Sequence, residues 1–317
     1  MTNSTQPVLC LGEALIDVIS RKDAEVEEHV GGSPLNVACG IAQLGHPTLM
    51  GSWFGEDQRG RMIERHLANA NVSVVEGSNK AKKTPIADAQ VDENGQATYE
   101  FDLDWQVPAL PSADEVSHLH IGSFSATLAP GAADVKKAID NSTGTVSYDP
   151  NARPSIMGSP EDVVPLVEEL ISESDLVKAS DEDIAWFYGE ETPIEEVMRR
   201  WLSLGASMVV ATRGPWGAYA KIASDRDMLV VDPLTVDIGD TVGAGDSFMA
   251  GLISGLLDAG LLGGADAKER LRNARLSDIR GALHRAVITS GITVSRAGAY
   301  APTMDEVEKV RSVDPLL

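Results

Sequence analysis

The stretch Asp240-Thr-Val-Gly-Ala-Gly-Asp246 stands directly before a segment with strong helical periodicity. Apolar residues of that segment recur at three- and four-residue spacing, which is typical of a helix with one buried face: Phe248, Met249, Leu252, Ile253, Leu256 and Leu257. The glycines therefore precede a helix N-terminus, where unpaired N–H groups and the helix dipole attract anions. This arrangement predicts a phosphate-binding loop.

Asp246 falls in the first turn of the predicted helix, beside this anion site. A carboxylate is poorly suited to bind a polyanion, but it can take a proton from an alcohol that attacks a phosphate. Gly243 and Gly245 leave the loop amides open to that phosphate. We therefore expect Asp246 to be a catalytic base. An ordinary first-turn aspartate is the competing interpretation, although it accounts neither for the glycines nor for Asp240.

Short apolar runs alternate with longer amphipathic segments along most of the chain. The predicted strands cover residues 8–11, 116–121, 145–148, 176–178 and 208–211, and the predicted helices cover residues 131–140, 161–172 and 193–204. The alternation predicts an α/β fold with a mainly parallel central sheet and helices on both faces. Ligands of such sheets collect at the carboxyl ends of the strands.

Two segments depart from this alternation. Residues 19–30 are polar and charged, and residues 84–105 contain β-forming residues around the turn signal Asp-Glu-Asn-Gly. We expect these segments to form a small inserted β-sheet, which would serve either as a lid over the ligand or as the interface of a homodimer. Because the 317 residues contain no internal repeat or long linker, a single domain spanning 1–317 is predicted.

A second glycine pair, in Gly31-Gly-Ser-Pro-Leu-Asn36, opens another predicted helix, with Ser33 as N-cap and Pro34 at its first position. Asn36 carries donors and an acceptor that suit the paired hydroxyls of a sugar, and glycines permit close approach of a ligand. Asp17, at the end of the first apolar run, could accept hydrogen bonds from two adjacent hydroxyls. A tight turn and an ordinary turn aspartate are the alternatives.

Charge and composition exclude several classes of function. The formal net charge of −22 repels nucleic acid and anionic membranes, so neither is expected as a partner. Cys10 and Cys39 provide no disulfide framework, which indicates a reducing, cytoplasmic location. Gly55 and Gly60 have P-loop spacing but are followed by Arg61, and no dinucleotide fingerprint is complete, which disfavours an oxidoreductase.

The two glycine motifs together resemble the signatures of the ribokinase-like, PfkB-type family of carbohydrate kinases. The first signature runs from Gly31 to Gly45 and the second from Asp240 to Gly251, in the order of the family, and the resemblance covers nearly the whole chain. It implies an ATP-dependent sugar kinase with a mainly parallel sheet and a small β lid over the sugar. It also implies that Asp246 deprotonates the sugar hydroxyl.

The resemblance further implies three sets of ligand contacts. The amides of Gly243, Ala244 and Gly245 would form the anion hole for the γ-phosphate. The residues expected to bind the sugar are Asp17, Gly31, Gly32 and Asn36. The residues expected to bind the nucleotide are Lys178, Ser180, Thr212, Gly214, Gly217, Ala286 and Ser290.

Metal sites follow from the same resemblance. The family usually carries an Asn-x-x-Glu motif that helps to organise Mg²⁺, whereas residues 180–183 here read Ser-Asp-Glu-Asp. Asp183 takes the place of the motif's glutamate and is the expected Mg²⁺ ligand, with Asp181 and Glu182 as alternatives. Many relatives bind a monovalent cation beside the anion hole, and Asp240 fits that role for K⁺.

The run Asp149-Pro-Asn-Ala-Arg153 follows a predicted strand, so Arg153 could reach the transferring phosphate and stabilise its charge. A surface arginine after a turn is the alternative. This run and the opening Gly12-Glu-Ala-Leu-Ile-Asp17 resemble the fructokinase branch, which implies fructose as substrate. Kinases for 2-keto-3-deoxygluconate, other sugar acids or inositol-derived sugars are the alternatives, as is a non-catalytic sugar or nucleotide sensor of the same fold.

Overall fold

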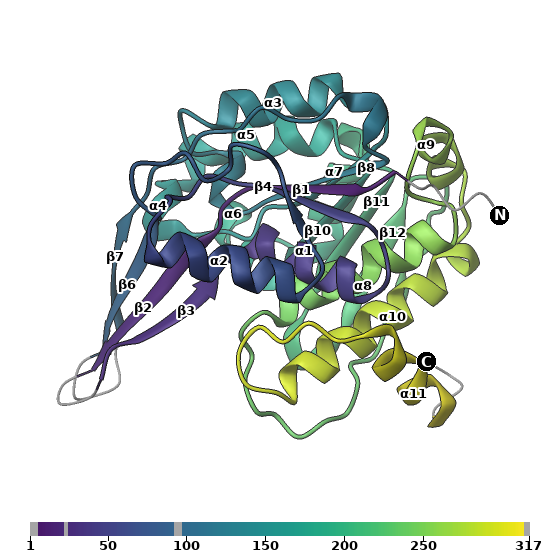
Figure 1. Ribbon diagram of the computed structural model, residues 1–317. Helices are drawn as coiled ribbons and strands as arrows, with labels where there is room; N and C mark the ends of the chain where they lie inside the picture. The colour runs from purple at the N-terminus through teal and green to yellow at the C-terminus, as the bar shows by residue number, and fades with distance from the viewer. Residues whose placement is uncertain (1–5, 22–24, 92–96, 314–317) are drawn as a thin grey trace.

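The computed structural model describes residues 6–21, 25–91 and 97–313. Within these ranges the chain forms two β-sheets with helices around the larger one (Figure 1). The larger sheet has nine strands in the order β13-β12-β11-β10-β9-β8-β1-β4-β5. In chain order they are β1 (Val8–Leu11), β4 (Thr48–Gly51), β5 (Ser73–Val74), β8 (His118–Gly122), β9 (Thr145–Asp149), β10 (Leu176–Ser180), β11 (Met208–Thr212), β12 (Ala218–Ile222) and β13 (Leu229–Val231).

The large sheet is mainly parallel, as predicted. Its strands run parallel from β11 to β5, and only the pairs β11–β12 and β12–β13 among the described strands are antiparallel. The five predicted strands are all present, with ends that differ by at most two residues from the expected ones. Their carboxyl ends therefore meet at one edge, where the β–α loops can supply a ligand site.

Helices cover both faces of the large sheet (Figure 1). One layer contains α3 (Ala132–Asn141), α5 (Pro160–Ser172), α6 (Asp181–Tyr188) and α7 (Ile194–Leu204). The other contains α1 (Ser33–Gln43), α8 (Ala244–Asp258) and α10 (Leu276–Val294). Side chains of β1 alternate between the layers, because Cys10 packs in the cluster of α8 and Leu9 in that of α5.

Four further helices lie around this core. The helix α2 (Gln58–Asn69) contacts the small sheet, α4 (Pro154–Met157) follows β9, α9 (Ala265–Arg272) contacts β9, and α11 (Met304–Val313) packs on α10. Within the described part of the chain, no helix has the length and apolar character needed to span a bilayer.

The small sheet has the order β3-β2-β6-β7 and consists of β2 (Leu15–Arg21), β3 (Glu27–Gly31), β6 (Ile86–Val91) and β7 (Ala97–Asp102). It projects from the body at the edge where the large-sheet strands end (Figure 1). The two predicted segments thus form one sheet, although β2 starts four residues earlier than residue 19. The turn signal at 92–95 lies outside the described residues.

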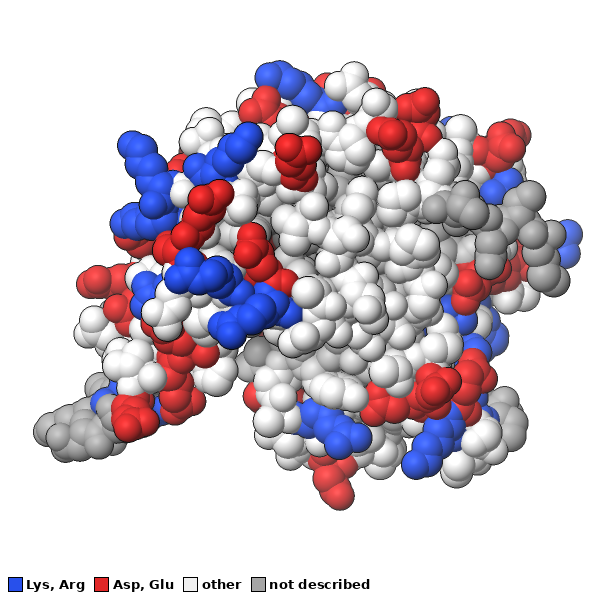
Figure 2. Space-filling model, in the orientation of Figure 1, with Lys and Arg blue, Asp and Glu red and all other residues white. Residues whose placement is uncertain are grey.

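Two polar contacts tie the small sheet to the body. Arg59 of α2 forms an ion pair with Glu28 of β3 at 2.6 Å. Asp57 caps α2 through Gly60 and also accepts hydrogen bonds from the amide and hydroxyl of Thr84, just before β6. Figure 2 shows basic side chains gathered over α2 next to acidic ones, with groups of both signs scattered over the rest of this face. The strand β3 and the segment that leads into β6 are therefore both anchored at α2.

Candidate active site

A cleft of about 1690 Å³ opens between the small sheet, the carboxyl ends of the large-sheet strands and the N-termini of α1 and α8. Most of the predicted site residues line it: Asp17, Gly31, Gly32, Asn36, Arg153, Lys178, Asp240, Gly243, Ala244, Gly245 and Asp246. The two glycine motifs, far apart in sequence, thus face one cavity.

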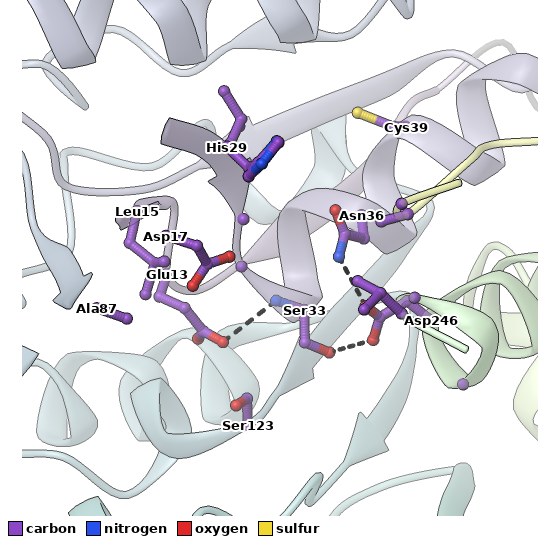
Figure 3. Close-up of a pocket in the computed structure, with 18 of the residues that line it drawn as sticks. Glu13, Leu15, Asp17, His29, Ser33, Asn36, Cys39, Ala87, Ser123 and Asp246 are labelled. Atoms are coloured by element: carbon purple, nitrogen blue, oxygen red, sulfur yellow. Dashed lines mark hydrogen bonds between the residues drawn. The ribbon is translucent and has the colours of Figure 1, made fainter. Parts of the chain in front are cut away.

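Asp246 lies in the first turn of α8, as predicted, and only 9% of it is exposed. Its Oδ1 accepts a hydrogen bond from the Ser33 hydroxyl at 2.6 Å, and its Oδ2 accepts one from the Asn36 side-chain amide at 2.8 Å (Figure 3). Ser33 was expected to cap α1, but Gly32 occupies the N-cap position and the Ser33 side chain turns to Asp246 instead. The first motif therefore orients the carboxylate of the second.

Burial raises the pKa of Asp246 above its ordinary value, because desolvation disfavours the charged form. The donors Ser33 and Asn36, and the charges of Lys178 and Arg153, act in the opposite direction without cancelling this effect. A carboxylate with a raised pKa is a stronger base in its ionised form. Each oxygen also retains a lone pair for a ligand hydroxyl.

The glycine loop has the geometry of an anion site. Gly243 is the N-cap of α8 with φ of 73°, a conformation that favours glycine, and a Cβ there would lie 2.6 Å from the Cβ of Ala299. A Cβ on Gly245 would lie 3.3 Å from Nζ of Lys178. The lysine therefore reaches the same space as the helix N-terminus, and both favour a phosphate.

Lys178 is buried and forms an ion pair with Asp149, whose Oδ2 lies 2.8 Å from the lysine Nζ. Burial works to lower the pKa of Lys178, but the carboxyls of Asp149, Asp183 and Asp246 together outweigh it and the net shift is upward. Burial also raises the pKa of Asp149, while Lys178 opposes that rise. The ion pair favours the charged form of both groups, and Lys178 presents its ammonium group to the cleft.

The first glycine motif, at Gly31 and Gly32, needs glycines because other groups of the chain approach its backbone closely. A Cβ on Gly31 would lie 2.2 Å from Oδ2 of Asp17. Gly32 has φ of 119°, and a Cβ there would lie 2.4 Å from the carbonyl oxygen of Glu13. Asp17 was expected at the end of a core strand, but it lies inside β2 of the small sheet, paired across strands with His29.

Arg153 follows β9 and precedes α4, at the wall of the cleft. Its guanidinium donates to the side chain of Asn151 at 2.8 Å and to the carbonyl of Ala152 at 2.9 Å. Its charge acts on the carboxyls of both Asp17 and Asp246. The arginine is therefore part of the cleft's electrostatics and is held by its own loop.

Of the predicted nucleotide residues, Lys178 lines the cleft, and Ser180 and Thr212 are register partners on the neighbouring strands β10 and β11. Ser180 caps α6, Thr212 ends β11, and the turn between β11 and β12 contains Gly214 and Gly217. Two more were expected from α10, Ala286 and Ser290. Ala286 is fully buried, with its Cα 2.9 Å from where a Cβ of Gly251 would lie, so it belongs to the α8–α10 contact. Ser290 is half-buried on the same helix.

The acidic residues proposed for metals have different surroundings. Both oxygens of Asp183 already accept backbone hydrogen bonds at 2.8 Å, from Ala152 and Ser180, and Asp183 does not line the cleft. Glu182 does line it. The structure thus brings the alternative Glu182 to the cleft, while Asp183 joins the loop after β9 to α6. The sequence around Asp183 could not reveal this role, because its hydrogen-bond donor Ala152 lies in a loop distant in the chain.

The side chain of Asp240 stabilises the glycine loop by accepting hydrogen bonds from backbone amides. It accepts hydrogen bonds from the amides of Val242 at 3.0 Å and Gly298 at 2.8 Å, and these donors lower its pKa. Within the described residues, no cluster of three or more His, Cys, Asp or Glu side chains forms a ready metal site. A carboxylate in the cleft together with phosphate oxygens is nevertheless a donor set that suits Mg²⁺.

Sequence reasoning missed the role of Glu13. It is 6% exposed, lines the cleft, and its Oε1 accepts a hydrogen bond from the Ser33 amide at 3.3 Å (Figure 3). A glutamate inside an apolar run, directly after Gly12, is the signal that could have found it, because buried unpaired carboxylates are rare.

Comparison with known proteins places the chain in a family. The model of the pfkB family carbohydrate kinase matches residues 5–306. A fructokinase of Rhizobium leguminosarum bv. trifolii is 31% identical over 264 residues, which cover 78% of this chain and 79% of that protein. Two crystal structures show the same fold. A fructokinase from Xylella fastidiosa with bound ATP has a TM-score of 0.81 at 22% identity and covers 98% of this chain and 99% of that one.

The other is a fructokinase double mutant from Vibrio cholerae O395 with fructose, ADP and a potassium ion, which has a TM-score of 0.77 at 23% identity and covers 98% of this chain and 99% of that one. The fold is thus ribokinase-like, with a mostly parallel large sheet and a separate small one. Family, fold and cleft agree with one another: the chain belongs to the pfkB family of carbohydrate kinases and is an ATP-dependent enzyme of that class.

Proposed function

We propose that this enzyme transfers the γ-phosphate of ATP to a hydroxyl group of a neutral sugar, with fructose as the substrate. The observation that carries the proposal is the placement of Asp246, held by Ser33 and Asn36 at the N-terminus of α8. A base is thereby set beside an anion site, as transfer to an alcohol requires. The similarity to fructokinases supports fructose.

In the proposed reaction the sugar hydroxyl gives its proton to Asp246. The hydroxyl oxygen forms a bond to the γ-phosphorus as the bond from that phosphorus to the ADP oxygen breaks. The amides of Gly243, Ala244 and Gly245 stabilise the charge on the transferring group. Lys178 lies close enough to Gly245 to add a positive charge there. Arg153, which lines the cleft between β9 and α4, adds a second positive charge for the phosphate.

Mg²⁺, when bound, would be held by Glu182 and by phosphate oxygens of ATP, and would neutralise phosphate charge.

The charge balance of the sugar side supports a neutral substrate. Glu13, Asp17 and Asp246 are three carboxylates in the same cleft, and Arg153 is the cation that acts on all of them. A sugar acid such as 2-keto-3-deoxygluconate would meet repulsion there, so a sugar-acid kinase is the second candidate. An inositol-derived sugar is neutral, and only the similarity to fructokinases places it after fructose.

A coupled assay of ADP release across hexoses, ketoses and sugar acids tests the proposal. Asp246→Asn should lower kcat by about 10³-fold, because the base is lost, while the Kd of the sugar stays within a few-fold. The matched control is Asp266→Asn, an exposed aspartate in the first turn of α9, which should keep wild-type rates. Full activity of Asp246→Asn would refute the mechanism. Sugar binding by the wild type without turnover would favour the non-catalytic sensor.

A further inference from the structure

Glu13 has an unsatisfied oxygen at the floor of the cleft. The residue lies between β1 and β2, and only 6% of it is exposed. Oε1 accepts the hydrogen bond from the Ser33 amide, whereas Oε2 is buried and has no hydrogen-bond partner within the described chain. The hydroxyls of Ser123 and Ser125 lie near enough to favour the ionised carboxylate, but neither completes a well-formed hydrogen bond to Oε2.

Ser123 presents a second unsatisfied group to the same cleft. It follows β8, is 1% exposed, and its hydroxyl likewise has no hydrogen-bond partner among the described residues. Its φ of 57° lies in the left-handed region, which is strained for a serine. Its amide donates to the carbonyl of Asp149 at 2.8 Å, which holds the strained turn in place. Strain of this kind persists where the surrounding structure enforces it, commonly at ligand sites.

Two adjacent buried groups without partners are unfavourable in the free protein. An unsatisfied buried polar atom destabilises the protein, and more strongly if it is charged. A buried water could satisfy them, but so could a ligand hydroxyl, because both side chains line the cleft that contains Asp17. Ser33 lies between Glu13 and Asp246 in Figure 3, so the two carboxylates face the same ligand space without touching.

We propose that Glu13 and Ser123 form a specificity subsite that binds a sugar hydroxyl other than the one that is phosphorylated. Oε2 of Glu13 accepts the hydrogen of that hydroxyl, and the Ser123 hydroxyl donates to its oxygen. The proposal rests on the sugar kinase function and deepens it, because it assigns the enzyme to polyhydroxylated substrates with a hydroxyl at one defined position. A deoxy sugar at that position would leave both buried groups unpaired.

Deoxy analogues give the sharpest test. The kcat/KM of the wild type, Glu13→Gln and Ser123→Ala is measured with fructose and its singly deoxygenated analogues, or with the neutral sugar that turns over fastest. At pH 8, above the raised pKa of Glu13, removal of one particular hydroxyl should lower the wild-type kcat/KM about 10- to 100-fold, as expected for a hydrogen bond to a charged group. In Glu13→Gln, removal of the same sugar hydroxyl should lower kcat/KM much less. The loss in Glu13→Gln with the intact sugar should fall mainly on the sugar KM, with the KM of ATP unchanged.

Two matched controls separate a substrate contact from a structural role. Asp175→Asn removes another buried carboxylate, just before β10 and outside the cleft, and Ser52→Ala removes another buried hydroxyl without a partner among the described residues. Both should shift the unfolding midpoint without changing the pattern across the analogues.

Each outcome decides the proposal. If Glu13→Gln and Ser123→Ala keep the wild-type pattern across all analogues and change only the unfolding midpoint, the groups bind a structural water and the proposal is wrong. If the wild type phosphorylates no sugar, the proposed function itself fails and the subsite fails with it. The wild-type arm therefore distinguishes the two failures.

Discussion

At the scale of single residues, the proposed role of Asp246 as the base depends on how its carboxylate is held. Desolvation raises its pKa, and the hydrogen bonds from Ser33 and Asn36 lower it. The same donors fix the direction of the carboxylate, so the loss of either donor changes both its pKa and its orientation. Each donor therefore has a measurable effect on the pH dependence of the reaction.

Asn36→Ala removes a donor that favours the ionised form of Asp246. The pKa of Asp246 should rise further, so the acid limb of the profile of kcat/KM against pH should move to higher pH. We also expect kcat to fall by about 10-fold as the carboxylate loses its orientation. Asn273→Ala, at the end of α9, is the control and should leave the profile unchanged. A profile of Asn36→Ala that coincides with the wild type would contradict this view.

Glu13 has a consequence for stability. Burial raises its pKa from 4.5 to about 7, while Ser125, Ser123 and the charge of Arg153 oppose the shift. Between these two values the unfolded chain releases a proton that the folded chain keeps, so the free energy of unfolding should fall as the pH rises. The fall is at most about 3 kcal/mol.

Glu13→Gln abolishes this titration. Urea unfolding of both proteins from pH 4.5 to 8 should show the variant gaining stability relative to the wild type up to pH 7, and no further change above it. A difference between the two proteins that does not vary with pH would show that Glu13 titrates normally.

At the scale of elements, the site is assembled where α1, α8 and the small sheet meet. The helices α1 and α8 pack against each other, which brings the first motif to the second. Gly31 ends β3 directly beside Asp17 of β2, so the small sheet and α1 are joined at the expected sugar site. We expect this sheet to cover the sugar as a lid, and a homodimer through it stays a prediction.

Gly31→Ala tests this junction. A Cβ placed 2.2 Å from Oδ2 of Asp17 must displace that carboxylate, so the sugar KM should rise about 10-fold or more, the effect of losing a hydrogen bond to a charged group, while the KM of ATP changes little. Gly264→Ala is the control, because a Cβ there meets open space. Equal sugar KM values for both variants would remove Asp17 from the sugar site.

At the scale of the whole molecule, the net charge of −22 opposes the compact state through mutual repulsion. Salt should therefore raise the melting temperature by a few degrees, to a similar extent with KCl and with choline chloride, because screening depends on ionic strength.

If K⁺ also binds near Asp240, kcat/KM should be higher in KCl than in choline chloride at equal ionic strength. Equal activity in the two salts would exclude a requirement for K⁺. One domain spanning 1–317 stays a prediction.

Local patterns were readable in the sequence because they depend on near neighbours. The strand at Val8–Leu11 and the position of Asp246 in the first turn of α8 follow from periodicity and glycine placement over a few residues. The assignments that failed or stayed open involve distant partners. Ser33 bonds to a residue 213 positions away, and Asp183 bonds to the loop after β9.

The sequence by itself determined an α/β kinase of the pfkB type and predicted a catalytic aspartate behind a glycine loop, because these features depend on residue type and spacing. Only the tertiary structure decided that Ser33 and Asn36 hold that aspartate, that Asp17 belongs to the small sheet, and that Glu13 lies buried in the cleft. The reason is physical: hydrogen-bond partners and desolvation are set by the packing of segments far apart in the chain, and one segment's pattern carries no record of its neighbours.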